Sequence, residues 1–111
     1  MKNPEPWYSA KCVFLHSTRE RRPKRCYEER ITLIRASSFK EALRKGEAEA
    51  RRYAKSLKGT RYLGFISVYN LFDSKVGDGT EIYSLMHTTP LSSKAYLRRY
   101  YQGGSYHERV V

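Results

Sequence analysis

The chain has 111 residues, a length typical of one domain, and a formal net charge of +11 at pH 7 from 22 Lys and Arg against 11 Asp and Glu. Its 40% hydrophobic content, with ten Tyr and four Phe, excludes a disordered chain. It has no apolar run near the roughly 20 residues of a membrane helix, and we do not expect its N-terminal residues to act as a signal peptide. We therefore expect a single cytoplasmic domain over residues 1–111, ordered over about residues 7–101, with a loose C-terminal tail.

Two β-strands are predicted near the N-terminus. Residues 7–15 alternate, with an apolar side chain at every second position from Tyr8 to Phe14. Residues 27–36 are rich in β-branched and aromatic side chains, which favour strands. The stretch between them is strongly basic, and Pro23 within it prevents continuous pairing. The two strands should therefore form a hairpin with a basic loop at its tip.

The next segment has the signals of an α-helix. Ser38 and Glu41 fit the capping-box pattern, in which the Ser38 hydroxyl accepts from the Glu41 N–H and the Glu41 carboxylate reaches back. A helix should therefore cover residues 38–57 and end at Gly59. Small residues in the middle of its apolar stripe allow a close approach to a sheet. The stripe comprises Phe39, Leu43, Gly46, Ala50, Tyr53, Ala54 and Leu57.

Two more strands and a second helix are predicted after it. Residues 62–72 are apolar on both faces, which is typical of a strand covered on both sides. The composition of residues 73–79 indicates a turn. Residues 80–88 should form a fourth strand that Pro90 ends, and a short helix should run from residue 92 or 93 to residue 101.

The predicted order of elements is β-β-α-β-β-α. This order is typical of an α+β domain, with a four-stranded antiparallel sheet and two helices on one face. Apolar residues on the opposite face of the first and third strands would then need cover as well. A homodimer through that face is one solution.

Cys12 and Cys26 lie symmetrically about the basic loop, so a disulfide across the hairpin is geometrically conceivable. Because no secretion signal precedes them, two reduced thiols are the favoured interpretation. The two cysteines and the scattered His16, His87 and His107 lack the spacing of zinc ligands. We therefore expect neither a metal nor another cofactor.

The chain shows no catalytic constellation. Glu29 should point toward the core together with Tyr27, and its carboxylate then needs a partner. The candidates are Arg30, Lys11 or a tyrosine hydroxyl. Catalysis would need a second placed acid or a histidine, and the aspartates of residues 73–79 fit a turn better than a metal site. We therefore expect that the protein is not an enzyme.

Positive side chains gather in three places. Five of the seven residues 19–25 are basic, five more share the polar face of the predicted long helix, and two arginines are adjacent in the second helix. Lys and Arg gain affinity for phosphates by releasing counterions, without reading sequence. We therefore predict non-catalytic, non-specific binding of DNA or RNA, mainly through phosphate contacts. The candidate residues are Arg19, Arg21, Arg22, Lys24, Arg25, Lys40, Arg44, Arg51, Lys55, Lys58, Arg98 and Arg99.

The alternative hypothesis is a protein-interaction module, of an antitoxin-like, immunity-like or phage-accessory kind, that binds an acidic protein partner. A nucleic-acid binder should show a steep salt dependence and bind many sequences. A dedicated protein partner should give a defined stoichiometry and a nonpolar interface.

Several segments resemble a known family. The sequences WYSAK at residues 7–11 and YEERI at residues 27–31 are fairly specific as a pair. The other matching segments are residues 36–42, 62–65 and 79–84. Together they resemble the bacterial domain of unknown function 4288 over about residues 7–91. The resemblance implies one compact cytoplasmic domain of bacterial or phage-like origin and no established activity. The basic loop is not part of the family pattern, so a function built on it would be peculiar to this chain.

Overall fold

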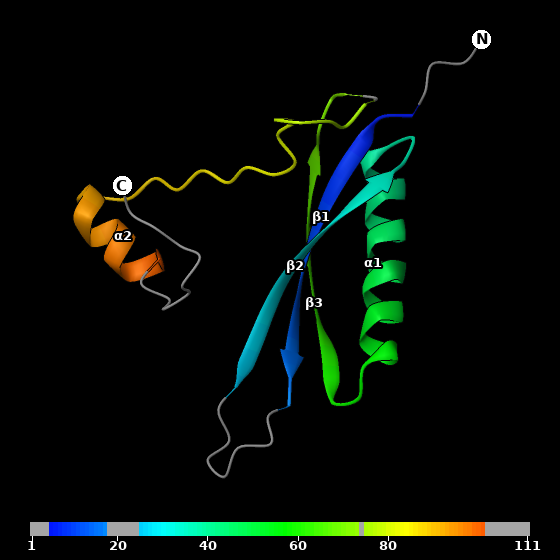
Figure 1. Ribbon diagram of the computed structural model, residues 1–111, viewed down its shortest axis with the longest axis horizontal. Coiled ribbons are helices and arrows are strands. Elements are labelled where there is room, and N and C mark those ends of the chain that lie inside the picture. Colours follow the sequence, from blue (N-terminus) through cyan, green and yellow to red (C-terminus); the bar gives the residue numbers. More distant parts are fainter. Residues whose placement is uncertain (1–4, 18–24, 74, 102–111) are drawn as a thin grey trace.

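The computed structural model describes residues 5–17, 25–73 and 75–101. Within these residues the elements are β1 (Trp7–His16), β2 (Cys26–Arg35), α1 (Phe39–Ser56), β3 (Thr60–Asn70) and α2 (Ser93–Tyr101). The strands form an antiparallel sheet in the order β2-β1-β3, and α1 lies against one of its faces (Figure 1). The predicted α+β class is confirmed.

The predicted fourth strand is wrong, and with it the four-stranded sheet. In the described part of the chain, residues 80–88 pair with no strand. Tyr83 still touches the sheet, because its hydroxyl donates to Ser67 Oγ at 3.1 Å and its ring lies 6.3 Å from that of Tyr69. Beyond it the chain leaves β3, and Met86 is 92% exposed. Apolar alternation does not form a strand here because no neighbouring strand satisfies the backbone N–H and C=O groups.

The predicted hairpin is confirmed, since all ten residues of β1 pair with β2. Its register separates the two cysteines. Cys12 lies opposite Arg30, and Cys26 lies opposite His16, so the disulfide that was conceivable across the hairpin does not fit this register. Both cysteines are free, with Cys12 buried and Cys26 exposed.

The two faces of β2 are the reverse of the sequence-based expectation. Its side chains on the α1 side are Glu28, Arg30, Thr32 and Ile34, which pair with the buried residues of β1. Glu29 lies on the opposite face with a 64% exposed side chain, so its predicted inward orientation is wrong. Of the candidate partners of Glu29, Lys11 forms an ion pair with it at 3.2 Å. Alternation defines two faces of a strand, and only packing decides which one is inside.

The predicted long helix is confirmed almost to the residue. The Ser38 hydroxyl accepts from the Glu41 N–H at 3.1 Å, as the cap pattern predicts. The Glu41 carboxylate accepts from the hydroxyl and N–H of Ser37, one residue earlier than expected. These bonds lower the pKa of Glu41. The cap fixes where α1 begins and therefore which side chains it turns toward the sheet.

The core lies between α1 and the inner face of the sheet. A Cβ on Gly46 would lie 2.7 Å from Ile66 Cδ1 and 3.1 Å from Ala10 Cβ, so a side chain here would force Ile66 to move. One turn later, Ala50 is fully buried against Phe14. The Phe14 ring lies 4.9 Å from the ring of Tyr53. The predicted small-residue stripe therefore sets the distance between helix and sheet.

The second predicted helix is confirmed as α2, but it contacts neither α1 nor any of the three strands. Residues 84–92 carry it away from the sheet on the side opposite α1 (Figure 1). The expectation that both helices cover one face is therefore wrong for α2. The radius of gyration is 17.0 Å, against about 13 Å for a compact domain of this length. The predicted loose tail lies outside the described residues.

Candidate nucleic-acid interface

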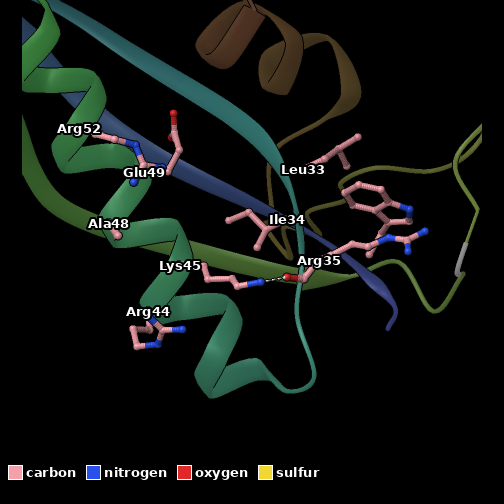
Figure 2. Close-up of a pocket in the computed structure, with 9 residues that line it drawn as sticks. Leu33, Ile34, Arg35, Arg44, Lys45, Ala48, Glu49 and Arg52 are labelled. Atoms are coloured by element: carbon pink, nitrogen blue, oxygen red, sulfur yellow. Dashed lines mark hydrogen bonds between the residues drawn. The ribbon is translucent and has the colours of Figure 1, made fainter. Parts of the chain in front are cut away.

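A groove of about 540 Å³ lies between α1 and β2, the edge strand of the sheet (Figure 2). Residues seven apart on a helix, such as Lys45 and Arg52, return to the same flank after two turns. This flank of α1 faces the end of β2. The groove is lined by Trp7, Leu33, Ile34, Arg35, Arg44, Lys45, Ala48, Glu49 and Arg52. Four of these side chains are basic and one is acidic.

Lys45 joins the helix to the strand. Its ammonium group donates to the Arg35 carbonyl oxygen at 2.6 Å, which Figure 2 marks with a dashed line. It also lies 3.6 Å from the Glu41 carboxylate. The contact covers one carbonyl of an open strand edge and fixes the width of the groove. The positive charge of Lys45 is thus partly compensated within the fold by the Arg35 carbonyl oxygen and the Glu41 carboxylate.

Glu49, the acidic residue of the groove, is already neutralised. Its carboxylate accepts from Arg30 Nη1 at 2.6 Å, with both side chains half-buried. This hydrogen bond raises the pKa of Arg30, whose guanidinium also lies 3.9 Å from the centre of the Tyr53 ring. Glu49 therefore offers little repulsion to an anion in the groove.

Arg44 and Arg52 are the two exposed guanidinium groups of α1 in the groove. Within residues 5–17, 25–73 and 75–101, neither has an ion-pair or hydrogen-bond partner. The exposed Ala48, with its small side chain, lies between them along the helix, and all three residues line the groove (Figure 2). Two unpartnered cations on either side of an open position can hold an anionic group.

An aromatic surface borders the basic side chains. The guanidinium carbon of Arg35 lies 4.6 Å from the centre of the half-buried Trp7 ring. Stacking of a cation on an indole holds both groups flat. Planar groups of this kind are surfaces on which nucleic-acid bases stack.

The structure brings only part of the predicted set to this groove. Arg44 lines it, and Lys40 adjoins it through a neighbouring hollow of about 380 Å³ that Arg44 also lines. Arg51 lies on the other flank of α1, paired with Glu47 at 3.2 Å. Lys55 and Lys58 are exposed near the C-terminal end of the helix.

The other predicted residues lie elsewhere or are not described. Arg25 is exposed at the start of β2, whereas the groove lies at the other end of this strand. Arg98 and Arg99 are on α2, which stands apart from the sheet. Arg19, Arg21, Arg22 and Lys24 lie outside the described residues.

Sequence reasoning missed Trp7, Arg35, Lys45 and Arg52 as parts of one site. The seven-residue spacing of Lys45 and Arg52 was a usable signal, because it places both on one helical flank. They were missed because the predicted set follows the flank of Lys40, Arg44 and Arg51, whereas Lys45 and Arg52 lie roughly 100° further round the helix. No sequence signal joins Arg35 to this flank, because only the packing angle of α1 on the sheet brings β2 beside it.

A second polar cluster lies at the opposite end of the sheet. Glu28 Oε1 accepts from the Tyr53 hydroxyl at 2.7 Å and lies 2.9 Å from His16 Nε2. His16 Nδ1 lies 2.7 Å from Thr60 Oγ1. The Tyr53 hydrogen bond lowers the pKa of Glu28 against the opposing effect of burial, and His16 adds to the lowering. These contacts join both hairpin strands to α1 and β3, which is a structural role.

Metal ligands and membrane spans are not found in the described part of the chain. Among residues 5–17, 25–73 and 75–101, no group of three or more His, Cys, Asp or Glu side chains is placed to hold a metal ion. No described helix is both long enough and apolar enough to cross a membrane.

Fold and groove together define a small basic α+β domain. In it a helix packs on a three-stranded antiparallel sheet made of the β1–β2 hairpin and β3. A family model described as Domain of unknown function (DUF4288) matches residues 7–84. The chain belongs to this family, as the resemblance indicated. The match covers β1 to β3 and ends before α2, whereas the resemblance was expected to reach about residue 91. Neither the curated proteins nor the solved structures contain a match to the chain.

Proposed function

We propose that this protein binds nucleic acid without catalysis, mainly through phosphate contacts in the basic groove. One observation carries the proposal. Arg44 and Arg52 are exposed on either side of Ala48 and have no anionic partner in the described residues, while the nearby Glu49 is already paired with Arg30.

The free energy of such binding comes largely from the release of counterions condensed on the nucleic acid. An arginine that is already in an ion pair must lose that partner before it binds a phosphate. Arg44 and Arg52 lose none, whereas Arg51 must give up Glu47. The formal charge of +11 adds a long-range attraction that brings polyanions to the surface.

The groove is small, so a bound strand would extend beyond it. Lys40 lies at one end of α1 and Lys55 and Lys58 at the other. These lysines would contact phosphates on either side of the groove. Arg25, exposed at the other end of β2, would add a further contact, and the basic residues 19, 21, 22 and 24 are candidates from the sequence alone. Trp7 and Arg35 offer a stacking surface where a base is unpaired.

An acidic protein partner is the second candidate. The observation that favours it is the apolar surface beside the basic side chains, where Leu33 is 41% exposed and Trp7 half-buried. Protein interfaces combine an apolar centre with a polar rim. This candidate predicts one stoichiometric partner and no general affinity for nucleic acids.

The test uses the double variant Arg44→Ser/Arg52→Ser and a matched control, Arg61→Ser/Lys75→Ser, which removes two exposed charges away from the groove. Binding of labelled duplexes and single strands of unrelated sequence is measured by fluorescence anisotropy at several salt concentrations. The groove variant should bind all of them more weakly. Its slope of log affinity against log salt should be flatter by about 1.8 for duplexes and about 1.4 for single strands, because two arginines no longer neutralise phosphates.

The control variant should keep nearly the wild-type slope. Equal weakening by both variants would mean that only net charge matters and that the groove is not the interface. A wild-type protein that binds no more tightly than an unrelated protein of equal charge would overturn the nucleic-acid proposal in favour of an acidic protein partner.

A further inference from the structure

The sheet face opposite α1 carries exposed apolar side chains. We call this surface the open face and define it by Tyr27, Ile31 and Leu33 of β2 and Phe65 of β3. These side chains are 53%, 42%, 41% and 53% exposed, respectively. Tyr83 covers the neighbouring region at Ser67 and Tyr69 but not these four residues. Burying one face of a sheet under a helix leaves the other face to be covered by something else.

α2 is the second exposed apolar surface, covered in part by His87, whose ring lies 5.9 Å from that of Tyr96 and 5.6 Å from that of Tyr100. Its apolar side consists of Tyr96, Leu97, Tyr100 and Tyr101, and Arg98 and Arg99 lie on its other side. The Tyr100 side chain is 50% exposed and that of Tyr101 is 56% exposed. Helices shorter than about 12–15 residues are marginal in water unless a surface stabilises them. α2 has nine residues and contacts no other described element, so it needs such a surface.

We infer that α2 of one copy packs on the open face of a second copy, so that the protein is a homodimer with exchanged C-terminal arms. The linker of residues 84–92 holds α2 away from its own sheet in an extended path (Figure 1). Nine extended residues span up to about 30 Å, enough to reach a neighbouring molecule. The exchange is reciprocal, so each copy gives one helix and receives one.

The surface area is sufficient for a stable dimer. The side chains of Leu85, Met86 and the apolar side of α2 would remove on the order of 500 Å² of apolar surface per arm, by the areas typical of such residues. Two arms and the two sheet faces that receive them give roughly 2,000 Å² in total, which is at the upper end of a standard interface.

Charge makes only a small contribution to this docking. α2 carries Lys94, Arg98 and Arg99 and no acidic residue. Glu29 lies among the open-face residues of β2 with a 64% exposed side chain, but it is already paired with Lys11 at 3.2 Å.

Leu33 lines the groove and also belongs to the open face, whereas Arg44, Lys45 and Arg52 are on α1. Docking on the open face leaves these cations free, so this inference does not depend on nucleic-acid binding.

The experiment measures the mass of the full chain by light scattering and sedimentation over a range of concentrations. The wild type should have twice the monomer mass of 13.1 kDa. Ile31→Glu in the open face and Leu97→Glu in α2 should each shift the protein to monomer. Val76→Glu, an equal change of an exposed apolar residue in the turn before the arm, should remain a dimer. Circular dichroism checks that each variant keeps its fold.

A mixture of the two variants separates arm exchange from other dimers. The arm of Ile31→Glu is intact, and so is the open face of Leu97→Glu, so one of the two docking contacts can form. Mixing should therefore restore association, more weakly than in the wild type. A monomeric wild type would overturn the inference, because α2 would then fold onto its own sheet or remain free. A dimer insensitive to Leu97→Glu, or variants that do not associate when mixed, would also overturn it.

Discussion

Ala50 shows how much one small residue determines in this fold. It is fully buried where α1 meets Cys12 and Phe14 of β1. We predict that Ala50→Leu destabilises the protein by roughly 1–3 kcal/mol, because three more carbon atoms must enter a filled contact. Thermal unfolding followed by circular dichroism measures the change. Ala48→Leu, the same substitution at an exposed position of the same helix, should change the midpoint little. An unchanged midpoint for Ala50→Leu would contradict the close helix–sheet contact.

Glu28 is the residue that should make stability depend on pH. Its pKa is lowered from 4.5 chiefly by the Tyr53 hydroxyl and also by His16 and Arg30. A carboxyl group with a lower pKa in the folded state stabilises the fold above its unfolded pKa, and this contribution is lost as the pH falls through the folded value. The stabilisation should thus be complete near neutral pH and disappear below about pH 4.5.

Urea unfolding at neutral and acidic pH tests this prediction. Between the two conditions the wild type should lose more unfolding free energy than Glu28→Gln, whose side chain does not ionise. The exposed Glu81→Gln serves as the control and should lose as much as the wild type. If Glu28→Gln were as acid-sensitive as the wild type, the Tyr53–Glu28–His16 cluster would not control acid stability.

At the scale of elements, local signals predicted α1 and α2 well and the fourth strand badly. A helix satisfies its own backbone hydrogen bonds, so the Ser38 cap and the apolar stripe were sufficient to predict α1. A strand needs a neighbour. Residues 80–88 have an alternating pattern, but after Tyr83 they diverge from β3 and find no partner in the described residues. The pattern is the same whether or not a partner strand is present.

The position of α2 illustrates the same difference. The tyrosines and Leu97 correctly predicted one apolar side of a helix. These residues did not reveal which surface the apolar side of α2 covers, because any apolar surface can pack against it. In this structure α2 contacts neither α1 nor the three strands of its own copy. The arm-exchanged dimer is our proposal for the surface that remains.

For the whole molecule, described positive charge lies at both ends of β2. Arg25 immediately precedes the strand, whereas Arg35 ends it beside the groove. We predict that replacing Arg21, Arg22, Lys24 and Arg25 with Ser weakens nucleic-acid binding about equally for unrelated sequences. The slope of log affinity against log salt should flatten by roughly 0.7–0.9 for each phosphate that the variant no longer neutralises. Anisotropy titrations at several salt concentrations measure this slope.

The loop and groove variants together show whether one nucleic acid contacts both regions. If it does, combining the substitutions should reduce the slope by the sum of the single effects. Melting of the loop variant should remain close to that of the wild type, since Arg25 is exposed and contributes nothing to the core. A loop variant with the wild-type slope would limit the interface to the groove.

The amino-acid sequence by itself determined the α+β class, the hairpin, the boundaries of both helices and the family. These features follow from interactions between residues close in the chain, such as the Ser38–Glu41 cap, or from short segments read in order. Only the tertiary structure decided three other features. They are the face of β2 that is inside, the separation of Cys12 from Cys26, and the assembly of the groove. The physical reason is that alternation in a strand and the period of a helix define faces without distinguishing what each face packs against. In this sense the two patterns are symmetric. The angle at which α1 packs across Gly46 and Ala50 removes that symmetry and brings Arg35 beside Arg44 and Lys45.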